Sequence, residues 1–441
     1  MNSNNVFANL IAAYPTFDVL RPFIEGLGIQ VNTKEGDPLV VCRYNREKAD
    51  MTNPVVRAFR SVIWDSVGNR PVFVAPAKSE LLATAPPAYD QTLLVEDFVD
   101  GVMVNVFVDP RAGKWRLATR SRLDADNKFY EHTFASLFMS AWLTCYPAAP
   151  AFENLNPAMS YSFVLQHPAN RIVVPVAIPA LVCVEASTIN PLGQVMTLPV
   201  GGMLPLLSPR RYAVTDATQF AQLLQHLEQH EGIRSQGLVL RELGTGKRWK
   251  ARTNAYTMTK KLRGNHSRLE YVWFENMQKG TLDTYLGLYP EEKVQASDAM
   301  KNWTRILAEV YDWYVHVYKV RDVPKDTIPA HYKGVLFDLH GEYIKRLAPA
   351  KLSLTWNEFQ SVMARQDLKR IVFLTTFKAG ASAPPSAKRT VAAKEKRVAA
   401  ASASATASAA AAAGGGASPT HSGATSPKAP AAEGFVDAAM V

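Results

Sequence analysis

The sequence has few cysteines and no recognisable metal-ligand spacing. Its three cysteines, Cys42, Cys145 and Cys183, are scattered along the chain. This excludes a disulfide framework and favours buried thiols in a reducing compartment. None of the nine histidines has the spacing of a zinc site, and we therefore expect no metal site of that kind.

Long apolar runs are also missing. No uninterrupted stretch reaches the roughly 18 apolar residues that a membrane span needs. The opening residues, MNSNNVFANLIAAYP, lack both a basic segment and a sustained apolar run, so we expect no signal peptide. These absences predict a soluble, intracellular, cytoplasmic protein without a membrane partner.

Acidic residues are fewer than basic residues. The 441 residues include 49 lysines and arginines against 39 acidic residues, a formal net charge of +10. Such an excess favours a polyanionic partner such as a nucleic acid or a nucleotide. A basic, solvated surface without a specific partner is the alternative.

The composition changes abruptly near Lys378. Alanine, serine, glycine and proline dominate residues 379–441, which have little to bury, and we expect this tail to be disordered. The segment AKRTVAAKEKRVAA contributes a basic cluster: Lys388, Arg389, Lys394, Lys396 and Arg397. The cluster is either a nuclear import signal, a tether for nucleic acid or a protein partner, or a solvated group of charges.

Residues 1–265 have the pattern of an α+β domain with antiparallel sheets. The segment VFVDPRAGKWRLATRS predicts a hairpin, with Trp115, Leu117 and Thr119 on one face. The segment TDATQFAQLLQHLEQH predicts a helix capped by Thr215 or Asp216.

Residues 266–378 have a helical pattern. Apolar side chains recur at steps of three and four residues in SDAMKNWTRILAEVYDWYVHVYKV, from Trp303 to Val317. This spacing favours a buried helix face over an aromatic surface that stacks nucleobases. We expect a helical domain here, between the α+β domain and the tail.

Charged residues and glycines occur in a particular order along the α+β region. They are Arg60 in FRSVIWD, Lys78, the segment FVDG from Phe98 to Gly101, Arg171 in FVLQHPANRIVV, Gly237 in SQGLVL, and Lys250 and Arg252 in KAR. Each is individually more typical of an ordinary surface charge or turn. Together, over residues 40–265, they resemble the covalent nucleotidyltransferases, and most closely the RNA ligases of the phage T4 tRNA-repair type.

The resemblance implies the nucleotidyltransferase fold of RNA ligases followed by a helical domain. It also implies a chemistry in which a lysine amine attacks the α-phosphorus of ATP and expels pyrophosphate. The amine must be neutral, and a desolvated, electropositive setting lowers its pKa. Basic residues hold the phosphates, and carboxylates hold Mg²⁺ or Mn²⁺. The resemblance assigns phosphate or nucleotide contacts to these residues: Arg60, Lys78, Asp100, Gly101, Arg120, Lys250 and Arg252.

The chain departs from the family pattern at chemical positions. Phe98 stands where the Lys-x-Asp-Gly motif has its nucleophile, and Val164 and Gln236 stand where the family has glutamates. Most carboxylates that would hold a divalent metal are thereby missing.

Three hypotheses follow. The chain is a ligase-like protein, of a type frequent in viruses, that binds ATP or RNA ends, such as broken tRNA, without reacting. Alternatively, it is an active RNA-repair ligase that uses a relocated lysine such as Lys78. The third hypothesis is a structural or interaction scaffold on a ligase fold.

Overall fold

The computed structural model describes residues 5–82, 88–128, 131–198, 200, 206–243 and 245–377. The expected tail, 379–441, and its basic cluster lie outside these residues. The chain divides into two compact units: Met1–Trp303 with Ala364–Thr376, and Thr304–Met363 with the residues from Phe377 onward. The first unit contains three largely antiparallel sheets and several helices, which confirms the α+β prediction.

The first sheet has the strand order β1-β2-β3-β4, all antiparallel. Its strands are β1 Ile29–Asn32, β2 Leu39–Tyr44, β3 Val62–Asp65 and β4 Arg70–Val74. Alternate residues of β2 point to opposite faces, as the pleat requires. Val40 and Cys42 pack in a core with residues of α1 Val6–Ala13 and α2 Phe17–Gly26, whereas Leu39 and Val41 face the second sheet.

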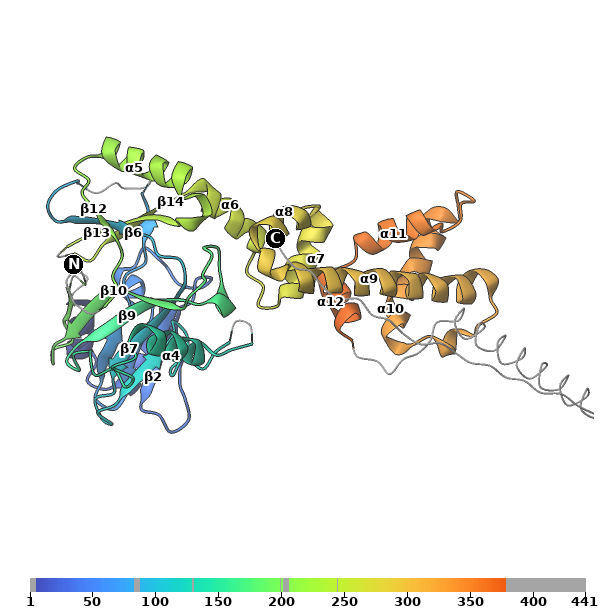
Figure 1. Ribbon diagram of the computed structural model, residues 1–441. Coiled ribbons are helices and arrows are strands. Elements are labelled where there is room, and N and C mark those ends of the chain that lie inside the picture. Colours follow the sequence, from blue (N-terminus) through green and yellow to red (C-terminus); the bar gives the residue numbers. More distant parts are fainter. Residues whose placement is uncertain are drawn as a thin grey trace, which may run out of the picture. The chain divides into compact units, whose positions relative to one another are not determined.

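The second sheet has the order β11-β10-β9-β7-β8. Its strands are β7 Val102–Val108, β8 Trp115–Ala118, β9 Ser160–Gln166, β10 Ala180–Ile189 and β11 Val195–Leu198. The expected hairpin is confirmed, because β7 pairs antiparallel with β8. Helix α4, Phe134–Cys145, packs on this sheet (Figure 1).

The third sheet has the order β12-β6-β13-β14-β5. Its strands are β5 Glu80–Leu81, β6 Leu93–Asp97, β12 Arg211–Tyr212, β13 Gly237–Glu242 and β14 Arg248–Arg252. Only the β14–β5 pairing is parallel in the described sheet. Helix α5, Ala217–His230, covers it (Figure 1), and Asp216, one of the two predicted residues, caps this helix by accepting from Gln219 N at 2.9 Å.

Helices follow the sheets. They are α6 Asn254–Arg263, α7 Leu269–Lys279, α8 Leu282–Leu288, α9 Lys293–Tyr314, α10 Ala330–Glu342, α11 Trp356–Ala364 and α12 Leu368–Thr376, besides the short α3 Pro54–Ala58 near the N-terminus. The aromatic stripe predicted for α9 is a core face, since Trp303, Trp313 and Tyr314 are each 5% exposed or less. Among the described helices, none is both long and apolar enough to cross a membrane.

Candidate phosphate-binding site

The segment Phe98–Gly101 connects the third sheet to the second. The backbone N of Phe98 donates to Gly237 O at 2.9 Å, directly after β6. At the other end, β7 begins at Val102, which pairs with Leu165 of β9. Four residues are therefore fixed at the junction of two sheets.

Two glycines permit this junction. Gly101 has a φ of 151°, and a Cβ there would lie 2.4 Å from Leu165 O. Gly237 has a φ of 119°, and its Cβ would lie 2.1 Å from Ala251 O. Any side chain would collide with a backbone carbonyl, and the φ values are ones that only glycine adopts readily. Glycine at both positions is thus a requirement of strand packing.

The Asp100 carboxylate is buried, and both of its oxygens accept hydrogen bonds from other parts of the chain. Its Oδ2 accepts from the backbone N atoms of Val173 and Val174, both at 3.0 Å, and its Oδ1 accepts from Tyr256 Oη at 2.7 Å. Its backbone carbonyl accepts from Gln166 Nε2 at 2.9 Å. Burial, together with the negative charge of Asp100, raises the pKa of Tyr256. The carboxylate thus joins three separate segments of the chain.

Phe98 is half-buried and lies against a guanidinium group. The Cζ of Arg252 lies 5.2 Å from the centre of the Phe98 ring, a cation–π distance. The amide of Gln236, oriented to satisfy both of its polar atoms, donates to Val99 O at 3.2 Å and accepts from Arg252 Nε at 3.3 Å. Phe98 and Gln236 together hold Arg252 beside the loop.

Val164 lies on the other side of the loop. It is 7% exposed, pairs with Met103, and its Cγ1 would lie 2.7 Å from a Cβ at Gly101. The position offers only an apolar surface to the junction.

Arg60 and Arg120 lie together. The Nη1 of Arg60 donates to Pro76 O at 2.8 Å and to Ala77 O at 3.1 Å. The Nε of Arg120 donates to Arg60 O at 3.3 Å. Burial, followed by the positive charge of Arg248, lowers the pKa of Arg60 to about 10. Burial likewise lowers the pKa of Arg120. Both guanidinium groups have lost water without gaining a carboxylate partner.

Lys250 and Lys78 approach through strand pairing. Lys250 of β14 is in register with Leu81 of β5, three residues after the exposed Lys78. Burial lowers the pKa of Lys250, and the charges of Arg252, Lys78, Arg60 and Arg46 lower it further.

Lys260 joins the same region from α6. It lies 5.7 Å from the ring of Tyr256, and burial and Arg252 lower its pKa while Asp100 raises it.

We refer to these residues as the cationic cluster: Arg46, Arg60, Lys78, Arg120, Lys250, Arg252 and Lys260. Within the part of the chain that the structure describes, none of them forms an ion pair with a carboxylate. Unbalanced positive charges at this density repel one another and create a potential that attracts polyanions.

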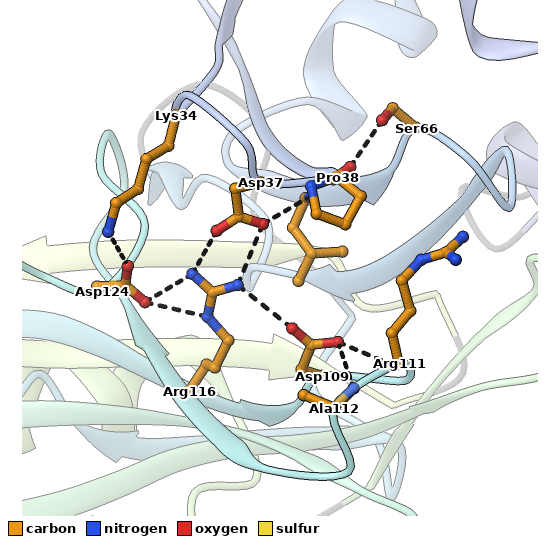
Figure 2. A network of polar contacts seen from close by, with 10 residues as sticks. Lys34, Asp37, Pro38, Ser66, Asp109, Arg111, Ala112, Arg116 and Asp124 are labelled. Carbon is orange, nitrogen blue, oxygen red and sulfur yellow. Dashed lines mark hydrogen bonds and ion pairs between the residues drawn. The ribbon is translucent and has the colours of Figure 1, made fainter.

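Several buried or half-buried arginines outside the cluster are paired with carboxylates. Arg248 lies 2.6 Å from Glu185, and Arg241 lies 3.5 Å from Glu96. Figure 2 shows Arg116, which contacts Asp37 at 2.7 Å, Asp124 at 2.8 Å and Asp109 at 3.3 Å. The charges of these arginines are balanced by carboxylates, whereas those of the cluster are not.

The structure brings most of the sequence-predicted residues together. Arg60, Lys78, Arg120, Lys250 and Arg252 belong to one cluster, in which Arg252 lies against Phe98. Asp100 and Gly101 lie at the same junction but serve its packing. Their roles toward a ligand remain predictions.

The sequence analysis missed Arg46, Lys260 and Tyr256. The spacing of Tyr256 and Lys260, four residues apart on one helix, placed them on a common face. Nothing in the sequence indicated that this face meets Asp100. Among the described residues, no group of three or more histidine, cysteine or acidic side chains could hold a metal ion.

No protein-family model and no curated protein matches this chain. Among solved structures, an archaeal ATP-dependent RNA ligase is 12% identical, with a TM-score of 0.38 over 66% of this chain and 73% of that one. A second form of the archaeal ligase is 11% identical, with a TM-score of 0.38 over 66% and 77%. A mutant RNA ligase of Naegleria gruberi with ATP and Mn is 14% identical, with a TM-score of 0.33 over 54% and 82%. Likenesses of this extent establish neither a family nor an activity for this chain.

Proposed function

We propose that this protein binds the phosphates of a nucleic-acid end, or of ATP, in the cationic cluster, and that it does not form a covalent adenylate. The observation that carries the proposal is a cluster of cations without ion-paired carboxylates among the described residues, in which Arg252 lies against Phe98 and Lys250 feels the charges of Arg252, Lys78, Arg60 and Arg46. Phosphate oxygens would supply the missing negative charge, and arginine is suited to bind them in pairs. RNA with a phosphorylated end is the partner that the sequence resemblance implies.

The proposal that no covalent adenylate forms is based on Phe98. A phenyl ring cannot attack phosphorus, and here it lies 5.2 Å from the Arg252 guanidinium. Gln236 provides no negative charge, and the Asp100 carboxylate already accepts hydrogen bonds from three donors. We assign charge neutralisation to arginine and lysine, and no step of the proposal uses a metal ion.

A relocated nucleophile is the second candidate, and one observation favours it. Lys250 is partly desolvated and surrounded by positive charge, and its pKa is lowered. These are the conditions in which a lysine amine becomes nucleophilic. Lys78, the lysine proposed from the sequence, is exposed. If adenylation occurs, we expect a bond from Lys250 Nζ to the α-phosphorus, with loss of the amine proton and of pyrophosphate.

The proposal predicts RNA binding that weakens steeply with salt, because basic contacts release counterions from the strand. The double change Lys250→Ala and Arg252→Ala should lower affinity for a 5′-phosphorylated single-stranded RNA about tenfold or more. It should also reduce the slope of log affinity against log salt by about 1.4, at roughly 0.7 per lost contact. Fluorescence anisotropy at several salt concentrations measures both quantities.

The matched control removes the same charge elsewhere. Lys279 and Lys301 are exposed and paired with Glu275 and Asp298. The double change Lys279→Ala and Lys301→Ala should leave the slope unchanged. Equal effects of the two double variants would mean that only net charge matters, and the proposed site would be wrong.

A further inference from the structure

Phe98 is a large apolar side chain that lies outside the cores of the three sheets. It is half-buried, and it belongs to none of the hydrophobic cores that these sheets form with one another and with their helices. The contact that its ring makes is with the guanidinium group of Arg252, at 5.2 Å from Cζ to the ring centre. Core packing therefore does not explain why an aromatic ring occupies this position.

The backbone that carries the ring is fixed. The N atom of Phe98 donates to Gly237 O at 2.9 Å, and the next residue, Val99, accepts from the side chain of Gln236 at 3.2 Å. The carboxylate of Asp100 accepts three further hydrogen bonds. A side chain on a backbone held at three successive residues loses little more freedom when a ligand packs on it. The ring is thus preorganised for a contact.

The ring also lies beside cations. Lys250 precedes Arg252 by two positions on β14, so both side chains leave the same face of the strand. On α6, the Nζ of Lys260 lies 5.7 Å from the centre of the Tyr256 ring, and the Cζ of Arg252 lies 5.9 Å from the same centre. Proteins that bind single-stranded nucleic acid combine these two elements, with cations along the backbone and aromatic rings against the bases.

The chemistry of stacking restricts the ligand. A base inside a duplex has both faces covered by its neighbours, whereas a base in a single strand or a free nucleotide has a face to offer. Because every base has such a face, a phenyl ring does not read sequence. The ligand that fits is a single-stranded end or a nucleotide, without preference among the bases.

We infer that Phe98 stacks on a nucleobase of the ligand whose phosphates lie in the cationic cluster. The inference deepens the proposed function and rests on it. Phe98 then has a role of its own in binding, beyond its contact with Arg252.

The test compares two ligands of equal length and charge by fluorescence anisotropy. One is a 5′-phosphorylated single-stranded RNA, and the other is a 5′-phosphorylated strand of abasic residues. The wild-type protein should bind the RNA about tenfold more tightly, the gain expected from one stacked base. Phe98→Leu keeps an apolar side chain without a π face and should remove that preference, whereas Phe98→Tyr should keep it.

The ratio of the two affinities within each variant separates stacking from a loss of charge. Phe98→Leu also releases Arg252, but that effect weakens both ligands and cancels in the ratio. Gln236→Leu removes the amide that accepts from Arg252 and leaves the ring in place, so it should keep the preference for RNA. Phe337→Leu, at a phenylalanine that is 74% exposed on α10, is the control for an unrelated ring and should bind both ligands like the wild type.

The outcomes distinguish this inference from the proposed function. A preference for RNA that survives in Phe98→Leu overturns the inference, as does a preference that Gln236→Leu removes equally, because the base then lies on Arg252. Equal binding of both ligands by the wild type overturns it too, while the proposed function stands. If neither ligand binds, the proposed function itself is wrong. Phe98→Met, a second replacement without a π face, takes the place of Phe98→Leu if that variant does not bind the abasic strand.

The source of the base follows from competition against labelled RNA. If ATP competes better than inorganic triphosphate, and Phe98→Leu removes the difference, the ring also holds the base of a free nucleotide. If the two compete equally, the ring serves the strand alone.

Discussion

At the scale of single residues, the proposed site depends on the contacts of Phe98, Gln236 and Arg252. The sequence resemblance places an amine at the position of Phe98, whose ring lies against Arg252. Gln236 provides an amide in place of a carboxylate and bonds that same arginine. An aromatic ring and a neutral amide hold a guanidinium group without neutralising it. Among the described residues no carboxylate pairs with Arg252, and the proposal assigns a phosphate to it.

Lys250 gives a pH-dependent prediction at the residue scale. Its pKa in the folded protein lies below the ordinary 10.5, chiefly through burial and then through neighbouring cations. The charged form is thus the disfavoured one, and stability rises as pH passes upward through the lowered pKa. Phosphate binding needs the charged form of Lys250. As the pH rises, the affinity for RNA should therefore begin to fall before the pH reaches 10.5.

The measurement compares wild type with Lys250→Arg, whose guanidinium stays charged. A 2′-O-methyl RNA survives alkali and serves as the probe at constant salt. The loss of affinity with pH should be shallower in the variant. Identical pH profiles would show that Lys250 does not contact the phosphates. Lys260, whose pKa is also lowered, accounts for the slope that remains.

At the scale of elements, Asp100 joins three segments: the loop after β6, the backbone at Val173 and Val174, and α6 through Tyr256. Asp100→Asn keeps one acceptor oxygen and loses the charge. We expect it to lower the free energy of unfolding by about 2–4 kcal/mol, because hydrogen bonds to a buried charged group are among the stronger ones. Tyr256→Phe should cost less, about 1–2 kcal/mol, since it removes one bond.

Urea unfolding measures both losses. Asp298→Asn is the control, since Asp298 is exposed and paired only with Lys301, and exposed pairs contribute little. If Asp100→Asn lowers the free energy of unfolding no more than the control does, the structural role of Asp100 is refuted.

Local patterns in the sequence predicted much of the fold. The alternation in VFVDPRAGKWRLATRS predicted the β7–β8 hairpin, and the apolar stripe predicted the buried face of α9. The order of basic residues indicated Arg60, Lys78, Lys250 and Arg252 as one group. Sequence could not reveal that Asp100 bonds Tyr256, which lies 156 positions away. Contacts of that kind depend on how sheets meet, and no local periodicity encodes them.

A pocket of about 570 Å³ between the first and second sheets was unpredictable for the same reason. Its walls combine residues 31–43 with residues 121–126, and neither segment has a motif. Arg43 sits in an ordinary apolar strand, LVVCRY, where the sequence gives no sign that its Nε lacks a partner. Such features follow from packing between two sheets.

For the whole molecule, the distribution of charge matters more than its total. The net charge of +10 favours polyanions in general, but the pairing of Arg116, Arg241 and Arg248 leaves the unbalanced part beside Phe98. The proposed site would use this charge to hold phosphates. It has no amine at the position where the sequence resemblance places the nucleophile.

The central claim is that phosphates bind here without a covalent step. The most direct measurement incubates the full-length protein with α-³²P-labelled ATP and Mg²⁺ or Mn²⁺, then separates it on a denaturing gel. In parallel, the same preparation is titrated with labelled 5′-phosphorylated RNA. We predict no labelled protein band together with salt-dependent RNA binding. A band that survives denaturation and disappears in Lys250→Ala or Lys78→Ala would contradict the account and reveal a working ligase with a relocated nucleophile.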